Sequence, residues 1–484
     1  MRLSYDNIIN STPQRLKMRL YIKIGMTLCC AFLATSCQTV KRARHIQKEE
    51  SMRPGERTVT AAELGITSES VLSLKELEDI AVRYAPDIIR AQQAMEAARV
   101  AVKDARADQL PSITANAGHS RSTKNSNVHH QKTNMEGSYS GNASLNWTVW
   151  DFDKTNISVR RARENLRAAE QDLRNAESLA IYHVRTAFFE LNRCIELDKV
   201  AAQAEEQYKE HLEQVKAKEE VGKGTSYDKT KAEVDFNNAM LEHVTTSHNT
   251  LNAWGDLYLA MGLAEAPEFK LGKGEMNDYK LNLDALLTLA NEKEPELAAL
   301  KSRASAASLY VDYTIKALYP TIGISLGASV TSHNLADFIW NLTGAASLAQ
   351  TIYNGGSNLR KIESAVVELQ TARANVSAKE QELFHQLRKA ILVAQRAEKQ
   401  LEVATLTEKS SKQNLDIVNE QFKVGRASSV ERTDAQVSHS QAQAAVVKAI
   451  YDRQDALAAI AHLTGDFVLH GEPNKPYRES HNNK

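Results

Sequence analysis

The sequence predicts a mixed α+β membrane protein in which two tandem copies of one module each combine a strand hairpin with long α-helical coiled-coil hairpins. An internal repeat, long proline-free segments and short alternating segments predict this fold. The pair Pro86 and Pro111 recurs at the same separation as Pro295 and Pro320, and VGKGTSYDKTKAEV recurs as VGRASSVERTDAQV. A period of about 200 residues is too long for a solenoid unit, so it indicates two copies of a large supersecondary unit.

The N-terminus has the features of an export signal over residues 1–36, with Met18 as the expected initiator. A charged region precedes about ten apolar residues, which are too few to span a bilayer that needs about 20. The tetrapeptide ATSC that ends at Cys37 resembles a bacterial lipobox, which predicts that Cys37 carries lipid and begins the mature protein. Gln38 implies, by resemblance to enterobacterial lipoproteins, passage to the outer membrane. The alternative is an ordinary secretory signal with an incidental cysteine.

Composition argues against several classes of protein. Lys plus Arg equals Asp plus Glu at 60 each, so the chain has no basic surplus for binding nucleic acid. A lipidated cysteine cannot pair with Cys194, so no disulfide framework is expected. The sequence has neither a catalytic triad pattern nor a phosphate-binding loop, so it does not indicate an enzyme. No cofactor is expected. Four histidines fall in the expected strand loops and are expected to be solvated: His119, His129, His130 and His333. The alternative is that they form a metal site.

The proline-free segments predict four long helices, at 156–221 and 227–261 in the first copy and at 357–423 and 429–464 in the second. The first would be about 100 Å long at about 1.5 Å per residue. Small and apolar residues recur at every seventh position in both longer helices, which is typical of a coiled-coil seam. The helix at 227–261 would be shorter than the long helix beside it, and the segment 295–318 has about the missing length. We therefore expect this segment of the second copy to stack end to end on it.

Between these helices the apolar period changes to two. Alternation predicts strands at 112–120, 139–150, 321–331 and 342–353. About ten residues each suits a tilted membrane crossing with apolar residues outside and polar residues inside a barrel; a soluble half-buried sheet is the alternative. The residues expected to face lipid are Ala143, Leu145, Ile324 and Leu326. Aromatic residues that suit a membrane-interface belt are Trp147, Trp150, Phe338, Trp340 and Tyr353.

Four strands cannot close a membrane barrel, because the smallest closed barrels use about eight strands. An open edge in lipid leaves backbone groups unpaired at a cost of several kcal/mol each. Other subunits must therefore supply the remaining strands. A homotrimer gives a twelve-stranded β-barrel, and its helices would continue it as a hollow α-helical barrel.

The turn motif of the second copy carries a family resemblance. Its residues are Phe422, Val424, Gly425, Ser429, Glu431, Asp434 and Ala435. Together with the repeat, they resemble the TolC-type outer-membrane channel proteins over about residues 71–466. The resemblance implies a trimeric passive duct for efflux of small molecules or type I secretion of proteins. It also implies two partners, a periplasmic adaptor and an inner-membrane pump of the RND or ABC type.

The resemblance implies a gate at the periplasmic tip of the helices. Gly222 and Gly425 would form the two turns, and the acidic Glu431 and Asp434 would line the entrance, with Asp228 as the first-copy counterpart of Glu431. The gate is also expected to include Phe422 and Arg426, and Arg426 could pair with Asp228 of a neighbouring hairpin. Arg432 would lie on another face of its helix. The alternative for the carboxylates is a solvated helix start, where the helix dipole favours negative charge.

A periplasmic adaptor is the alternative function, because adaptors also use long helical hairpins. An adaptor, however, has one hairpin flanked by domains rich in Gly and Val, whereas here strands precede each of two long helices. We therefore expect an outer-membrane, lipid-anchored channel that extends into the periplasm. The expected divisions are a signal at 1–36, a tether at 37–70, a first repeat at 71–262, a linker at 263–282, a second repeat at 283–466 and a polar tail at 467–484.

Overall fold

The computed structural model describes residues 39–41, 43–44, 61, 64–124, 134–222, 224–264, 267–272, 274, 276–333 and 338–466. Contacts divide the chain into a unit at 1–59, of which only short helical pieces are described, and a unit at 60–484 that holds every element named below. The predicted signal, Cys37 and the predicted tail at 467–484 lie outside the described residues.

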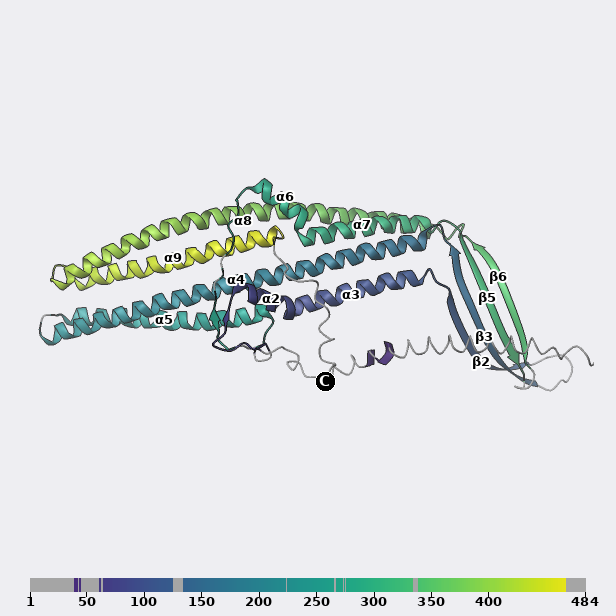
Figure 1. Cartoon of the computed structure of the whole chain (residues 1–484), viewed down its shortest axis with the longest axis horizontal. Coiled ribbons are helices and arrows are strands. Elements are labelled where there is room, and N and C mark those ends of the chain that lie inside the picture. The colour runs from purple at the N-terminus through teal and green to yellow at the C-terminus, as the bar shows by residue number, and fades with distance from the viewer. Residues whose placement is uncertain are drawn as a thin grey trace, which may run out of the picture. The chain divides into compact units, whose positions relative to one another are not determined.

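The larger unit is mostly helical, with one antiparallel sheet (Figure 1). Its elements up to residue 261 are β1 (Val71–Leu72), α2 (Leu74–Tyr84), α3 (Pro86–Ala107), β2 (Ser112–Lys124), β3 (Asn134–Trp150), α4 (Lys154–Glu220) and α5 (Ser226–Met261). The same order follows in β4 (Lys270–Leu271), α6 (Leu283–Lys293), α7 (Pro295–Lys316), β5 (Thr321–Ser332), β6 (Ile339–Ala349), α8 (Ser357–Lys423) and α9 (Ser429–Leu463). None of the described helices combines the length and apolarity needed to cross a membrane.

The four strands pair in the order β2-β3-β5-β6, with antiparallel neighbours throughout. β6 differs from the prediction, because it spans Ile339–Ala349 and not 342–353. Ala349 is the partner of Thr321, which follows Pro320. Proline has no N–H group to donate to a ladder, so the pairing ends there. At the other end β5 runs to Ser332, which gives β6 partners from Ile339 onward.

The helices near the sheet keep the order of the strands to which they are joined. Here α3 packs on α4, α4 on α7, and α7 on α8. In the other half, α5 packs on α4, α4 on α9, and α9 on α8. The unit therefore has four helical columns, of which two are the unbroken 67-residue helices α4 and α8.

The predicted end-to-end stacking of 295–318 on 227–261 is wrong. α5 ends at Gly262, where an added Cβ atom would lie 2.8 Å from the carbonyl oxygen of Tyr84, just before α3. α9 ends in the same way at Gly465, where a Cβ atom would lie 2.6 Å from the carbonyl oxygen of Lys293, just before α7. The columns are therefore α3 with α5 and α7 with α9. Estimates of helix length alone could not distinguish these partners.

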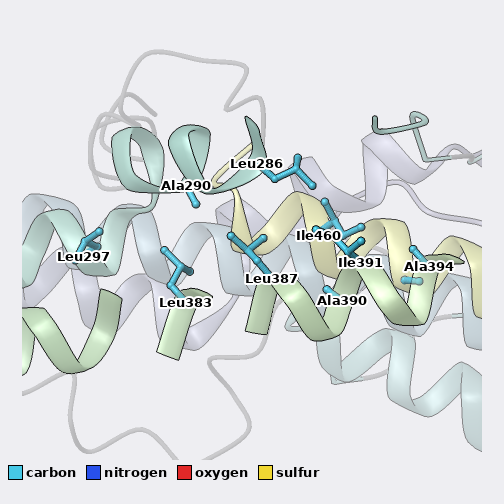
Figure 2. Packing of buried hydrophobic residues seen from close by; sticks show 10 residues of the cluster. Leu286, Ala290, Leu297, Leu383, Leu387, Ala390, Ile391, Ala394 and Ile460 are labelled. Atoms are coloured by element: carbon cyan, nitrogen blue, oxygen red, sulfur yellow. The ribbon is translucent and has the colours of Figure 1, made fainter. Parts of the chain in front are cut away.

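Buried leucines and isoleucines hold together the junction between α7 and α9 (Figure 2). Leu286 of α6 and Leu297 of α7 pack with Leu383 and Leu387 of α8 and with Ile460 of α9. Leu387 and Ile460 are fully buried. This cluster lies where α7 meets α9. The unbroken helix α8 packs against both of them and so holds the junction in line.

Two glycines with similar backbone conformations give a matched test of this junction: Gly465 lies at it, and Gly425 lies in the turn between α8 and α9. Gly465→Ala should lower the free energy of unfolding more than Gly425→Ala. Both residues have positive φ, at 63° and 73°, so both variants carry left-handed strain of about 1–2 kcal/mol. Only at Gly465 does the new methyl group also meet a neighbouring backbone, whereas Gly425 has nothing within 4 Å. Chemical denaturation followed by circular dichroism measures the difference, and equal losses would contradict the stacking.

Candidate functional site

Two glycine turns join the long helices to their returning partners at the end opposite the sheet (Figure 1). Gly222 has a φ of 72° and Gly425 a φ of 73°, and each follows a long helix. The Gly425 N–H donates to the carbonyl of Phe422 at 3.2 Å. This left-handed glycine conformation is the usual way to end a helix. The returning helices then start at Thr225 and Ser428.

Two of the predicted gate carboxylates cap these returning helices. Thr225 Oγ1 donates to Asp228 Oδ2 at 2.6 Å, and the Asp228 N–H donates back to the hydroxyl at 3.1 Å. Ser428 N–H donates to Glu431 Oε2 at 2.7 Å, which lowers the pKa of Glu431. Both are capping boxes, which satisfy backbone donors that a helix start leaves free. Within one chain, these two carboxylates therefore have the role that the helix-start alternative assigns to them.

The other predicted gate residues differ in their surroundings. Asp434 and Arg426 are exposed. Asp434 contributes, after burial and Asp235, to raising the pKa of Tyr208 to about 12. No ion pair between Arg426 and Asp228 occurs within the described part of the single chain. Their predicted pairing between neighbouring hairpins therefore stays a prediction.

Phe422 lies in a cluster that joins α8, α9 and α4. Its ring is buried, with Lys218 Nζ 3.8 Å and Arg432 Cζ 5.1 Å from the ring centroid. The His211 ring meets it edge-on at 5.7 Å. Cations placed over an aromatic ring are attracted by its quadrupole. Phe422 therefore serves as a packing centre between the two helical hairpins.

Sequence reasoning missed the polar part of this cluster. Arg432 Nη1 donates to His211 Nδ1 at 2.8 Å and to Gln214 Oε1 at 2.9 Å, both on α4. Its Nε donates to Asn419 of α8 at 2.9 Å. The one available signal was Arg432 itself, a cation between the two acidic positions of the turn motif. Its partner His211 lies more than 200 residues earlier, and no local pattern links the two.

The sheet places its apolar and polar residues on opposite faces. Leu145 lies between Ile113 and Leu326 in the ladder, and the neighbouring Asn146 lies between Ser112 and Ser325. The four residues predicted to face lipid all share the face of Leu145. The polar face of the four strands carries Ser, Thr, Asn, Gly and Ala between residues 112 and 120, 138 and 148, 321 and 331, and 341 and 349.

The sheet has two open edges. β2 and β6 each have a neighbour on one side only, so both outer edges offer unpaired backbone groups within the described chain. Aromatic rings gather at the strand ends near the helices, where Phe152 lies 5.4 Å from Tyr319 and 6.0 Å from Trp150. His119, expected in a strand loop, lies within β2 and stacks on Tyr139 of β3 at 4.2 Å. His129 and His130 lie outside the described residues.

Comparison with known proteins gives consistent results. The family model described as outer membrane efflux protein matches residues 79–263 and 286–466. The chain is 25% identical to the outer membrane efflux protein BepC of Brucella suis biovar 1 (strain 1330), over 66% of this chain and 71% of that protein. It is 22% identical to the probable outer membrane lipoprotein SilC of Salmonella typhimurium, over 76% of this chain and 80% of that protein.

A solved structure agrees at the level of the fold. The CmeC outer membrane channel of Campylobacter jejuni superposes with a TM-score of 0.73 at 17% identity, covering 81% of this chain and 85% of that one. The family match covers most of both halves of the chain and includes both glycine turns. The resemblance to TolC-type channels is thereby confirmed, and the chain belongs to the outer membrane efflux protein family.

Proposed function

We propose that three copies of this outer-membrane efflux protein form one passive duct of a tripartite export system, gated at its periplasmic tip. The observation that carries the proposal is the four-stranded sheet with one apolar face, one polar face and two open edges. Such a sheet suits lipid on one side and a water-filled lumen on the other. A periplasmic adaptor, the alternative, has no use for a lipid-facing sheet.

The open edges support three copies. Backbone groups in lipid need partners, so β2 of one copy would pair with β6 of the next until the sheet closes. Three sheets of four strands give the twelve strands of the expected barrel. The first and last helical columns also carry exposed apolar side chains. These are Val234, Leu241, Val244, Leu251 and Leu259 on α5, and Leu359, Val367, Leu392, Val403, Leu406 and Ile417 on α8.

The two turns of each copy would meet the turns of the other copies around one axis, at the tip that faces a periplasmic adaptor and an inner-membrane pump. There Glu431 and Asp434, which lie about one helical turn apart, would form a ring of negative charge. Capping does not remove this charge, since the hydrogen bonds from Ser428 favour the ionised form of Glu431. Arg426, exposed in the single chain, would pair with Asp228 of a neighbouring hairpin in the closed duct.

A lipid at Cys37 would add a second anchor in the outer membrane. The lipobox-like ATSC sequence supports it, and the relative SilC is named as a probable lipoprotein. An acyl chain contributes about 0.8 kcal/mol per buried methylene. The lipid would therefore assist the barrel, which remains the main anchor.

Exchanging one residue on each face of β3 tests the barrel. Leu145→Arg should reduce the amount of outer-membrane trimer more than Asn146→Arg, because an arginine at a lipid-facing midplane position costs about 2–4 kcal/mol. Heat-modifiable migration on gels measures the trimer. A greater loss with Asn146→Arg would mean that the two faces are assigned the wrong way round.

Removing the tip charges tests the gate. Glu431→Gln combined with Asp434→Asn should weaken cation selectivity and block by multivalent cations in planar bilayers. Glutamine can still complete the capping box, so the helix start is preserved while the charge is lost. Arg426→Ala should raise conductance by releasing the closed state. Unchanged selectivity and block in the double variant would place these carboxylates outside the entrance.

Labelling tests the anchor. Radioactive palmitate should enter the wild-type protein and not Cys37→Ser, because only the wild-type protein has the thiol that is acylated. The serine variant keeps the size of the side chain and removes only the acylated thiol. Equal labelling of the two proteins, or labelling of neither, would contradict lipidation at Cys37.

A further inference from the structure

One buried histidine takes part in the contact between the two helical hairpins near the turns. His211 of α4 is 4% exposed. Its Nδ1 faces Arg432 Nη1 at 2.8 Å, and its Nε2 faces Ser429 Oγ at 2.9 Å. Ser429 and Arg432 both belong to the first turn of α9. The imidazole therefore holds the start of α9 against α4.

These contacts determine the protonation state of His211. A guanidinium group has only donors, so Nδ1 must accept the bond from Arg432 and carries no proton. The single N–H of the neutral ring is then on Nε2, where it donates to the Ser429 hydroxyl. A proton on Nδ1 would place two donors and two positive charges face to face. The contact with Arg432 is therefore compatible only with the neutral ring.

The charged groups around His211 have opposite effects on its pKa. On α9, Arg432 disfavours the imidazolium, and Lys218 of α4 does the same. On α5, Asp235 and Asp228 favour it. From α8 the ring meets the uncharged Phe422. Burial first, and Arg432 second, outweigh the carboxylates and lower the pKa of His211 to about 4.

A protonated His211 has an acceptor on its own hairpin. Asp235 Oδ1 accepts from Lys231 at 2.6 Å, whereas Asp235 Oδ2 is buried and has no hydrogen-bond partner among the described residues. An unpartnered buried carboxylate oxygen is costly. Asp235 favours the charged form of His211 from within the α4–α5 hairpin. Protonation therefore removes the partner on the second hairpin while an attractive carboxylate on the first remains.

We propose that His211 is an acid-sensitive latch, whose neutral ring fastens the α8–α9 hairpin to α4 and whose protonation releases it. Released histidine titrates near 6.5, so the latched state binds fewer protons below that pH. Stability of the latch is complete above about pH 6.5 and is lost as the pH falls toward 4. Over this range each pH unit shifts the ratio of released to latched chains by up to roughly tenfold.

The consequence for transport rests on the proposed function. If the glycine turns form the gate, releasing α9 from α4 frees the second hairpin to move away from the first. The duct would then open more readily in an acidified periplasm. The latch itself is a property of two hairpins and does not require the gate.

A distance measurement tests the latch directly. Spin labels at Lys216→Cys in α4 and Ser438→Cys in α9 use two exposed positions. The labelled chains carry Cys29→Ser, Cys30→Ser, Cys37→Ser and Cys194→Ala, so that no other thiol takes a label, and unlabelled chains dilute them within each assembly. Double electron–electron resonance should give one short distance at pH 7.5. At pH 4.5 a longer distance should appear, with its population raised at least tenfold.

Two variants control the measurement. His211→Gln should keep the short distance at both pH values, because glutamine can accept from Arg432 and donate to Ser429 without titrating. His439→Gln should keep the wild-type response, because His439 bonds to Ser411 of α8 at 3.2 Å, within its own hairpin. An unchanged distance in the wild type, or a pH response that persists in His211→Gln, would overturn the latch.

Conductance in planar bilayers separates this proposal from the proposed gate. Openings should be more frequent at pH 4.5 than at pH 7.5 in the wild type, and equally frequent at both in His211→Gln. If the distance changes with pH while the conductance does not, the latch stands and the gate lies away from these turns. If neither changes, the latch is wrong, whatever the position of the gate.

Discussion

Unpaired backbone groups at the edges of the sheet are the constraint on which the rest of the molecule depends. A sheet of four strands with one apolar face cannot remain open in lipid, where each unsatisfied N–H or C=O costs several kcal/mol. The strands are joined directly to helices, and the helices pack in the order of the strands. Closing the sheet with further copies would therefore also close the helical columns into a ring.

The columns remain continuous because glycine ends two of the helices. Gly262 and Gly465 adopt left-handed conformations and lie against the backbone that precedes α3 and α7. Each short helix is thereby extended by a helix of its own half of the chain, to about the length of α4 or α8. The buried cluster around Leu387 holds the second of these junctions together. A rigid cylinder can then be built from helices that start and end at its middle.

Much of this arrangement could be predicted from local patterns. Period-two alternation identified the two faces of the strands, because side chains on a strand alternate regardless of their tertiary surroundings. The glycine turns at Gly222 and Gly425 followed from the repeat. The stacking of helices did not, since length agrees equally well with either partner and only the contacts of Gly262 and Gly465 decide. The bond between His211 and Arg432 joins residues far apart in sequence, so no local periodicity could reveal it.

The tip combines charges that respond differently to acid. Hydrogen bonds from Ser428 lower the pKa of Glu431, so this carboxylate keeps its charge to a lower pH than an ordinary glutamate. The guanidinium group of Arg432 stays protonated throughout. Burial and Arg432 lower the pKa of His211 to about 4, so its charge changes as the pH falls toward that value. Acid would therefore act on the attachment between the hairpins through His211, whereas Glu431 keeps the negative charge at the turn to a lower pH than an ordinary glutamate does. Under the proposed function, selectivity and opening then depend on different residues, Glu431 at the start of α9 and His211 within α4.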